Sequence, residues 1–407
     1  MAKKATRSEE DLFDEIAKAT GGEVLAKMDS VKYFVDTGNL AVNYMCSGQY
    51  ITGGVPGARV TEVFGPSSSG KSLFANNVLH GCQKLGGWPM ILDCENATNN
   101  DFMERANHLN LKQVLWYAPT SLEATFRKLH TVVKKIREHK PLNIPIVVVY
   151  DSISVSPCER ELRENDLPED YKASDWKKIV GRKEQPGERA RIAGNELRKL
   201  QAILGDMNVT VVIINQIREK IGVMFGSNET TAGGGKALEF YCSCRLRTAA
   251  RKKIENKRLE TFAGINLQVK NVKNKTHRPF ICVDDVKLYF ESGIDPLTGL
   301  LQSLRESERI KMVKVGHYKV NEAFLPDNCP EYTFKASKVR NDVPINVVLD
   351  CPKLIDAQTR EEVEEYFVDF QLALNSSSSG DFEEKEIAYD VDGDLIEVDD
   401  SGDSEEE

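Results

Sequence analysis

The sequence lacks every signal that would direct a chain into a membrane or out of the cell. No apolar run approaches the roughly 18 to 20 residues that a membrane span requires. Residues 2–14 are charged and hold no apolar stretch, so we expect no secretory signal peptide. The nine cysteines stand singly apart from Cys242 and Cys244, a spacing that fits neither a zinc knuckle nor a disulfide framework. We therefore expect reduced thiols, a cytoplasmic protein and no membrane partner.

The chain has no overall excess of positive charge, yet its net charge of −9 is unevenly distributed. Residues 376–407 hold 14 of the 63 acidic residues and one of the 54 basic ones, which leaves 53 basic and 49 acidic residues, a net of +4, in residues 1–375. The tail is also poor in apolar residues, so we predict that it is disordered. A uniformly acidic chain would argue against a nucleic-acid partner. Because residues 1–375 are mildly basic, that argument does not apply here.

Apolar and amphipathic segments alternate through the first half of the chain. Four apolar runs predict strands at 59–65, 88–95, 144–152 and 209–216. Amphipathic patterns predict helices at 71–85, 121–139 and 188–204. This succession predicts an α/β fold with an open, mainly parallel sheet flanked by helices. Half-buried antiparallel edge strands are predicted, from strict alternation, at 240–247, 264–271 and 279–290.

The segment GPSSSGKS at 65–72 fits the pattern G-x-x-x-x-G-K-[ST], and it lies between a predicted strand and a predicted helix. Its glycines let backbone N–H groups wrap around phosphate oxygens, and the helix start adds its dipole. Lys71 would reach the β- and γ-phosphates, and the Ser72 hydroxyl would hold Mg²⁺. The pattern predicts an ATP and Mg²⁺ site formed by Gly65, Pro66, Ser67, Ser68, Ser69, Gly70, Lys71 and Ser72.

Three other predicted strands end in polar side chains that would reach the same edge of the sheet. Asp151 ends a buried strand and is the natural second anchor for Mg²⁺. Glu95 could polarise the attacking water, but Asp93 lies two residues earlier on the same face, and spacing does not choose between them. Gln216 ends a further strand, where its amide could contact the γ-phosphate or the water.

These pieces, in this order, resemble the RecA family of homologous-recombination ATPases. The most specific match is NQIREKIGVMFGSNETTAGGGKALEFY at 215–241, and the similarity covers about residues 37–295. Further matches are found at 37–72, 92–96, 148–152 and 269–275. The stretch SGIDPLTGLL at 292–301 and the acidic tail look closer to phage-encoded recombinases of the UvsX kind.

The resemblance implies roles for individual residues. It implies that Glu95 activates water, that Gln216 senses the γ-phosphate, and that Lys273 and Lys275 reach the ATP of a neighbouring subunit, as arginine fingers do. Without the resemblance, the sequence pattern would indicate only that these two lysines lie on a solvated strand face. Two aromatic positions match family contacts, and either could equally be a core residue: Phe102 beside adenine and Phe240 at the subunit contact.

The segment after Gln216 looks like the family's second DNA-binding loop. Its cations would meet phosphates, and its apolar side chains would wedge between base steps of a stretched strand. Its glycines would let the loop order on binding DNA. The alternative is a lid whose apolar residues fold back on the core. The predicted DNA-binding residues are Arg218, Lys220, Ile221, Gly222, Val223, Met224, Phe225, Gly226 and Gly234.

The first DNA-binding loop should lie within 158–189, which is long, heavily charged and not recognisably similar to the family. Three of its cations could bind phosphate: Arg182, Lys183 and Arg189. The alternative, which we favour, is that this segment is a solvated insertion. We divide the chain into an N-terminal oligomerisation segment, a RecA-like P-loop ATPase core, a small C-terminal domain and the tail. The corresponding residues are 1–36, 37–292, 293–375 and 376–407.

The sequence thus predicts a DNA-dependent ATPase that forms a helical homo-filament on single-stranded DNA and exchanges strands with homologous double-stranded DNA. Single-strand-binding and mediator proteins are the expected helpers, in the cytoplasm of a bacterial host if the chain is phage-encoded. Three alternatives stay open: a recombination mediator or paralogue, a regulatory DNA-binding filament with weak ATPase, and a ring helicase with the same core.

Overall fold

The computed structural model describes residues 9–22, 24, 31–164, 187–219, 229–231, 233–256, 261–327, 329–336, 342–368, 382–389 and 395–397. The chain divides into two compact units, residues 1–32 and 33–407. The first contains one helix among its described residues, α1 (Glu9–Thr20), on which Leu12, Phe13 and Ile16 are exposed. Among the described residues, no helix is both long enough and apolar enough to span a bilayer.

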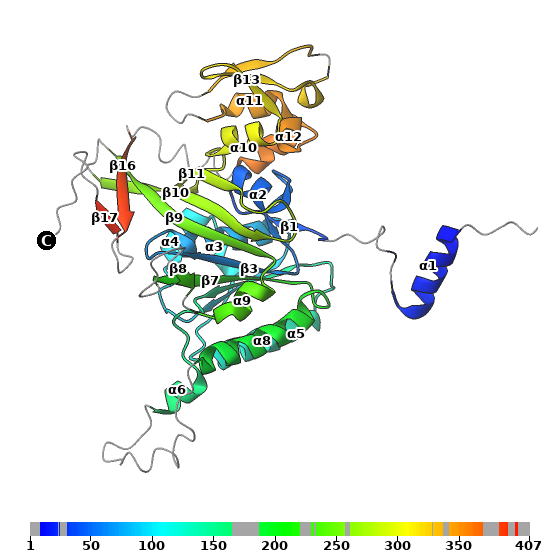
Figure 1. Ribbon diagram of the computed structural model, residues 1–407, viewed down its shortest axis with the longest axis vertical. Coiled ribbons are helices and arrows are strands. Elements are labelled where there is room, and N and C mark those ends of the chain that lie inside the picture. The colour runs from blue at the N-terminus through cyan, green and yellow to red at the C-terminus, as the bar shows by residue number, and fades with distance from the viewer. Residues whose placement is uncertain are drawn as a thin grey trace, which may run out of the picture. The chain divides into compact units, whose positions relative to one another are not determined.

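A large mixed sheet forms the centre of the second unit (Figure 1), in the order β12-β11-β10-β9-β3-β7-β6-β4-β5. The strands from β3 to β5 along this order are parallel, and β9 also runs parallel to β3. The strands from β9 to β12 are antiparallel. The predicted α/β fold, with a mainly parallel sheet and antiparallel edge strands, is therefore confirmed. The strands are β3 (Val60–Gly65), β4 (Trp88–Asp93), β5 (Leu115–Tyr117), β6 (Ile146–Asp151), β7 (Val209–Glu219), β9 (Cys244–Asn256), β10 (Thr261–Asn274), β11 (Cys282–Tyr289) and β12 (Gly293–Ile294).

The parallel strands are covered by helices on both faces, which explains their continuous apolar sequences. Val147 and Val149 of β6 pack into the cluster that includes α2, α3 and α4, whereas Val148 and Tyr150 pack into the cluster that includes α5, α8 and α9. This alternation follows from the two-residue period of a strand. Figure 1 shows α5, α8 and α9 together along one side of the sheet. The helices are α2 (Leu40–Ser47), α3 (Lys71–Lys84), α4 (Asn100–Asn107), α5 (Leu122–Arg137), α6 (Glu159–Glu164), α8 (Glu188–Leu204) and α9 (Gly235–Tyr241).

Smaller elements complete the connections of this unit. Two short strands pair near its start, and β8 pairs with the end of β7. Within residues 376–407 the structure describes two strands, of which β16 pairs with the outer half of β9 and with β17. These elements are β1 (Phe34–Val35), β2 (Val55–Pro56), η2 (Leu111–Gln113), β8 (Glu229–Thr231), β16 (Phe382–Tyr389) and β17 (Leu395–Glu397).

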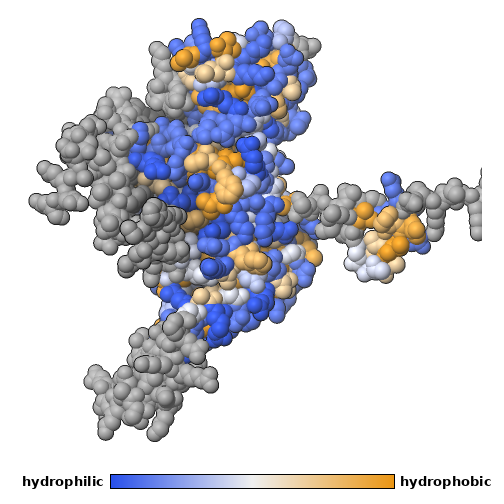
Figure 2. Space-filling model, viewed as in Figure 1, coloured by the Kyte–Doolittle hydropathy of each residue, from blue (hydrophilic) through white to orange (hydrophobic). Residues whose placement is uncertain are grey.

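The C-terminal region builds its own sheet and helices but shares its apolar core with the rest of the unit. Leu40 and Tyr50, which lie near the start of this unit, are fully buried in the apolar cluster of the C-terminal region. Figure 2 shows apolar residues at the end of the molecule that carries β13, where Val315 is 90% exposed. The elements are α10 (Leu300–Glu306), β13 (Ile310–Lys314), β14 (His317–Val320), η3 (Glu322–Phe324), β15 (Thr333–Lys335), α11 (Ile345–Asp350), η4 (Pro352–Ile355) and α12 (Arg360–Tyr366).

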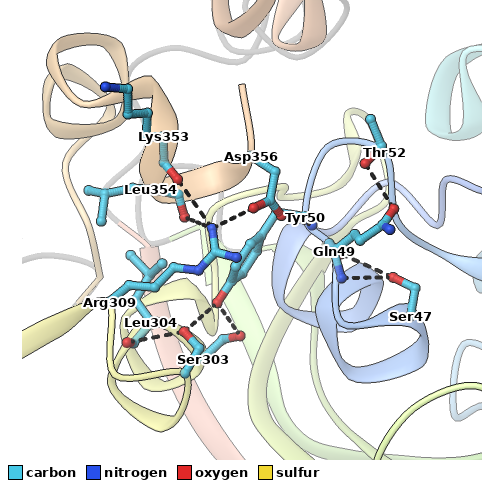
Figure 3. Close-up of polar contacts among 11 residues, drawn as sticks. Ser47, Gln49, Tyr50, Thr52, Ser303, Leu304, Arg309, Lys353, Leu354 and Asp356 are labelled. Carbon is cyan, nitrogen blue, oxygen red and sulfur yellow. Dashed lines mark hydrogen bonds and ion pairs between the residues drawn. The ribbon is translucent and has the colours of Figure 1, made fainter. Parts of the chain in front are cut away.

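A polar cluster around Tyr50 fixes this junction (Figure 3). The Arg309 guanidinium lies 4.6 Å from the centre of the Tyr50 ring and forms an ion pair of 2.7 Å with Asp356. The Tyr50 hydroxyl lies 3.1 Å from Ser303 Oγ and 3.0 Å from Ser307 Oγ. Burial raises the pKa of Tyr50 to about 12, so the hydroxyl keeps its proton and can donate to one serine while it accepts from the other. The C-terminal region is therefore held by directional contacts as well as by apolar packing.

Replacing Tyr50 with Phe should lower the free energy of unfolding by about 1 to 2 kcal/mol, because the buried Ser303 hydroxyl and the half-buried Ser307 hydroxyl each lose a hydrogen bond. Urea unfolding followed by circular dichroism measures this. Tyr44→Phe is the matched control, since its ring stacks on Tyr50 at 4.7 Å while the described residues offer its hydroxyl no hydrogen bond. Equal losses in the two variants would contradict the role given to the Tyr50 hydroxyl.

Candidate active site

The glycine-rich turn between β3 and α3 has the backbone geometry of a phosphate-binding loop. Gly70 has φ 71° immediately before the first helical residue, a conformation that favours glycine. A Cβ on Gly65 would lie 2.2 Å from the Thr248 carbonyl oxygen, so no side chain fits there. Lys71 Nζ donates to the carbonyl of Pro66 within the loop, and burial lowers the pKa of Lys71 to about 8. The turn thus leaves no space for a side chain at Gly65 and holds the Lys71 ammonium group within the loop.

A cavity of about 500 Å³ opens beside this turn. Most of the residues predicted for the nucleotide site line it: Ser67, Ser68, Ser69, Gly70, Lys71, Ser72, Glu95, Phe102, Asp151 and Gln216. Its opposite wall comes from the antiparallel strands and was not predicted: Lys253, Phe262, Gly264, Ile265, Leu288 and Phe290. Three aromatic rings among these lining residues provide apolar surface of the kind that a purine base needs.

Ser72 and Asp151, the two predicted Mg²⁺ ligands, are in contact. Ser72 Oγ donates to Asp151 Oδ2 at 2.6 Å. Burial raises the pKa of Asp151 to about 6, with Glu95 and Asp93 acting in the same direction and Ser72 and Lys71 opposing it. A hydroxyl and a carboxylate are the hard oxygen ligands that Mg²⁺ prefers, and a partial shell suits an ion that also binds phosphates and water. Within the described residues no group of three or more His, Cys, Asp or Glu could hold a metal alone.

The structure separates Glu95 from its competitor Asp93. Asp93 is 3% exposed, and its carboxylate accepts hydrogen bonds from the Glu95 and Thr98 backbone N–H groups, each at 3.1 Å, and from the Thr98 hydroxyl at 2.6 Å. Asp93 therefore shapes the turn that carries Glu95. Glu95 is exposed at the cavity, where Oε1 accepts from Ser152 Oγ at 2.8 Å. Geometry thus favours Glu95 as the base, and Ser152 as the residue that orients it.

Lys273 of β10 and Lys275, just after this strand, lie outside the cavity lining. Lys273 Nζ donates to the carbonyl oxygens of Glu239 and Phe240, at 3.1 Å for the latter, which places it at the end of α9. Burial lowers the pKa of Lys273, and the neighbouring charge of Lys275 adds to this effect. Lys275 is exposed, and Phe240 is 72% exposed. Neither lysine therefore lines the cavity beside this chain's own phosphate loop.

The predicted DNA-binding loop falls largely outside the described residues, which include none of Lys220, Ile221, Gly222, Val223, Met224, Phe225 and Gly226. Its two ends are described. Arg218 belongs to β7 and pairs through its backbone with Thr230 of β8. Gly234 has φ 74° before α9, and a Cβ there would lie 2.8 Å from Leu238 Cβ. The loop therefore leaves and re-enters the fold at adjacent, closely packed points.

Of the cations in 158–189 considered for phosphate binding, Arg182 and Lys183 lie outside the described residues. Arg189 is described and has another role. Its Nη2 donates to the carbonyl oxygens of Ile153, at 3.3 Å, and Ser154, at 2.6 Å. It thereby supports the turn after β6 that carries Ser152.

The phosphate loop after β3, Glu95 just beyond β4, Asp151 at the end of β6 and the amide near the end of β7 define a P-loop nucleotide-binding protein of the α/β class. The RecA N-terminal domain, as a sequence family, matches residues 10–295, and the chain belongs to the RecA family. That family is associated with DNA recombination and repair and with binding of ATP and DNA.

Bacterial proteins named Protein RecA are similar to this chain over much of its length. One from Rhodopirellula baltica is 34% identical over 364 residues, 87% of this chain and 88% of that protein. One from Thermus aquaticus is 28% identical over 375 residues, 89% of this chain and 100% of that protein. One from Caulobacter sp. (strain K31) is 35% identical over 263 residues, and the match spans 65% of each protein.

Proposed function

We propose that this chain is an ATP-dependent DNA recombinase that assembles as a helical filament on single-stranded DNA and exchanges strands with homologous duplex. One observation carries the proposal. Strand β7 contributes Gln216 to the nucleotide cavity and continues, within three residues, into the predicted DNA-binding loop. The same strand therefore connects the two ligands that a DNA-dependent ATPase must couple.

In this proposal each cavity residue has a distinct task in hydrolysis of ATP to ADP and phosphate. Lys71 binds the β- and γ-phosphates, and Ser72 and Asp151 would hold Mg²⁺. Bound Mg²⁺ would neutralise charge on the phosphates during the displacement. Glu95, held by Ser152, accepts a proton from the attacking water. Gln216 contacts the γ-phosphate and reports its presence to the loop.

Subunit assembly completes the site in this proposal. The position of Lys273 and Lys275 outside their own cavity supports a role in trans, on the ATP of a neighbouring subunit. Exposed Phe240, on the same helix end, supports a subunit contact. Phe102 lines the cavity, which favours the contact with adenine over a purely structural role. The residues around 292–301 and the acidic tail support a phage-encoded origin, hence a bacterial host cytoplasm and dedicated single-strand-binding and mediator partners.

A joint-molecule assay tests the proposal. Circular single strands and homologous linear duplex, incubated with the protein, ATP and Mg²⁺, should yield joint molecules whose formation requires homology. Filaments without joints would favour a regulatory filament, joints only in the presence of a second recombinase would favour a mediator, and unwinding of a forked duplex would favour a helicase. Each of these three outcomes contradicts the proposal.

The apolar residues of the loop should matter for strand exchange more than for hydrolysis. Replacing Ile221 and Met224 with Ala should slow joint-molecule formation about tenfold. Each wedged side chain offsets the free-energy cost of unstacking, which is about a few kcal/mol per base step. Basal ATPase should stay within about twofold, because neither side chain contacts phosphate in this proposal. Val313→Ala with Val315→Ala, on the exposed β13–β14 hairpin, is the matched control. An unchanged exchange rate in the loop variant would favour the lid interpretation.

A further inference from the structure

A buried ion pair links β3 to β9 at the centre of the sheet. Glu62 is fully buried, and its Oε2 lies 2.5 Å from Nε of Arg245, its register partner on the neighbouring strand. The Arg245 guanidinium also lies 4.8 Å from the centre of the Phe64 ring. Burying a carboxylate is costly unless it is paired and hydrogen-bonded, and a simple apolar pair would pack as well. The pair therefore calls for a role besides stability.

On one side, Glu62 is connected to the nucleotide cavity and to the end of the loop. Its Oε1 accepts a hydrogen bond of 2.8 Å from the Asn215 side-chain amide. The Asn215 Oδ1 in turn accepts from the backbone N–H groups of Gln216 and Gly233, each at 3.0 Å. The same amide also donates to the Gly233 carbonyl at 3.0 Å. One side chain thus binds the backbone of the predicted γ-phosphate sensor and that of Gly233, which lies between β8 and α9.

Gly233 is also closely packed against the turn after β6. A Cβ at this position would lie 2.8 Å from the backbone carbon of Ile153, in the turn that also presents Ser152 to Glu95. A displacement of the loop end must therefore be accommodated by Asn215, by the turn after β6, or by both.

On the other side, Arg245 is connected to the predicted trans-acting lysine. Its Nη2 forms an ion pair of 3.4 Å with Glu239 of α9. The Glu239 and Phe240 carbonyl oxygens accept from Lys273 Nζ. Lys273 is also the register partner of Arg245 across β10 and β9. Glu62, Arg245 and Lys273 thus occupy adjacent positions on three neighbouring strands, and α9 contacts both Arg245 and Lys273.

We propose that Glu62 and Arg245 are positioning residues that couple the nucleotide end of β7 to the subunit-facing Lys273. The proposal rests on the proposed function, because Lys273 needs a neighbouring subunit's ATP to act on. The pair keeps the loop end, Gln216 and the α9 carbonyl oxygens in one polar network, so an adjustment at Gln216 changes how α9 presents Lys273. Such a connection is a physical basis for coupling only if breaking it changes the coupling.

Glu62→Gln tests this, because glutamine is nearly isosteric and can still accept from Asn215 but cannot pair as a charge with Arg245. The quantity to measure is the ratio of ATPase rates with and without single-stranded DNA. We expect that ratio to fall about tenfold. Basal ATPase and binding of a fluorescent ATP analogue should stay within about twofold of the parent. Arg245→Lys, which keeps a cation, gives a second and milder variant should Glu62→Gln not fold.

Arg309→Lys is the matched control, because it alters a second largely buried ion pair remote from the cavity. It should lower the melting temperature without changing the stimulation ratio. The double variant Glu62→Gln with Lys273→Ala should lose no more stimulation than Lys273→Ala alone, since both changes interrupt one route. Stimulation of Glu62→Gln equal to that of the parent would overturn the inference. A parent protein that DNA does not stimulate would instead overturn the proposed function.

Discussion

Glu95→Gln should bind ATP and assemble on single-stranded DNA, yet hydrolyse ATP at least about 100-fold more slowly than the parent. The amide oxygen can still accept the Ser152 hydroxyl, so the turn keeps its geometry while the general base is lost. The filament should consequently persist, because hydrolysis would no longer release it. Phosphate release in steady state and dissociation from a labelled oligonucleotide measure the two effects.

Asp93→Asn is the matched control for Glu95→Gln, because spacing in the sequence does not choose between these two carboxylates. Its carboxylate accepts three hydrogen bonds inside the turn and lies away from solvent, so this change should cost about 1 to 3 kcal/mol of stability. The folded fraction should retain most of its hydrolysis rate. If Asp93→Asn lost as much rate as Glu95→Gln, or if Glu95→Gln kept the parental rate, the base would have to be reassigned.

Lys71→Ala should reduce hydrolysis by about 1000-fold or more and weaken nucleotide binding as well. In the structure the ammonium group lies within the loop on the Pro66 carbonyl, beside Asp151 and Glu95, so its removal leaves the converging acidic groups without their cation. Titration with a fluorescent ATP analogue separates the loss of binding from the loss of rate.

Lys253→Ala is the comparison for Lys71→Ala, because Lys253 lines the same cavity from β9. Its ammonium lies 4.6 Å from the centre of the Phe262 ring, on the wall opposite the phosphate loop. We expect a loss of less than about tenfold, confined to nucleotide affinity. Similar defects in the two lysine variants would indicate that the phosphates occupy a different part of the cavity.

Much of the sheet could be predicted because its sequence signals are local. The apolar runs of β6 and β7 require cover on both faces, and the phosphate loop fixes the junction of β3 with α3. The C-terminal strands of the sheet were predicted from alternation alone. Alternation does not show which strands pair or which side chains face one another. The cavity wall formed by Phe262 and Phe290 was therefore not predicted.

The ion pair of Glu62 shows the same limit at one residue. A glutamate inside the apolar strand at 59–65 is a visible signal, because a buried acid needs a cation. The cation is Arg245, 183 residues away, and only the folded sheet identifies it. Conversely, Asp93 and Glu95 have the same periodicity, and the hydrogen bonds of one turn distinguish them.

The shared core around Tyr50 determines where the chain can be cut. A fragment that stops at the end of the predicted ATPase core, near residue 292, would expose the fully buried side chains of Leu40 and Tyr50 to water. Leu40 begins the helix that also supports β10 and β11, so the damage would extend to the wall of the nucleotide cavity. A minimal fragment for crystallisation or for domain exchange between relatives must therefore retain the chain through α12, even though the lining of the cavity ends at Phe290.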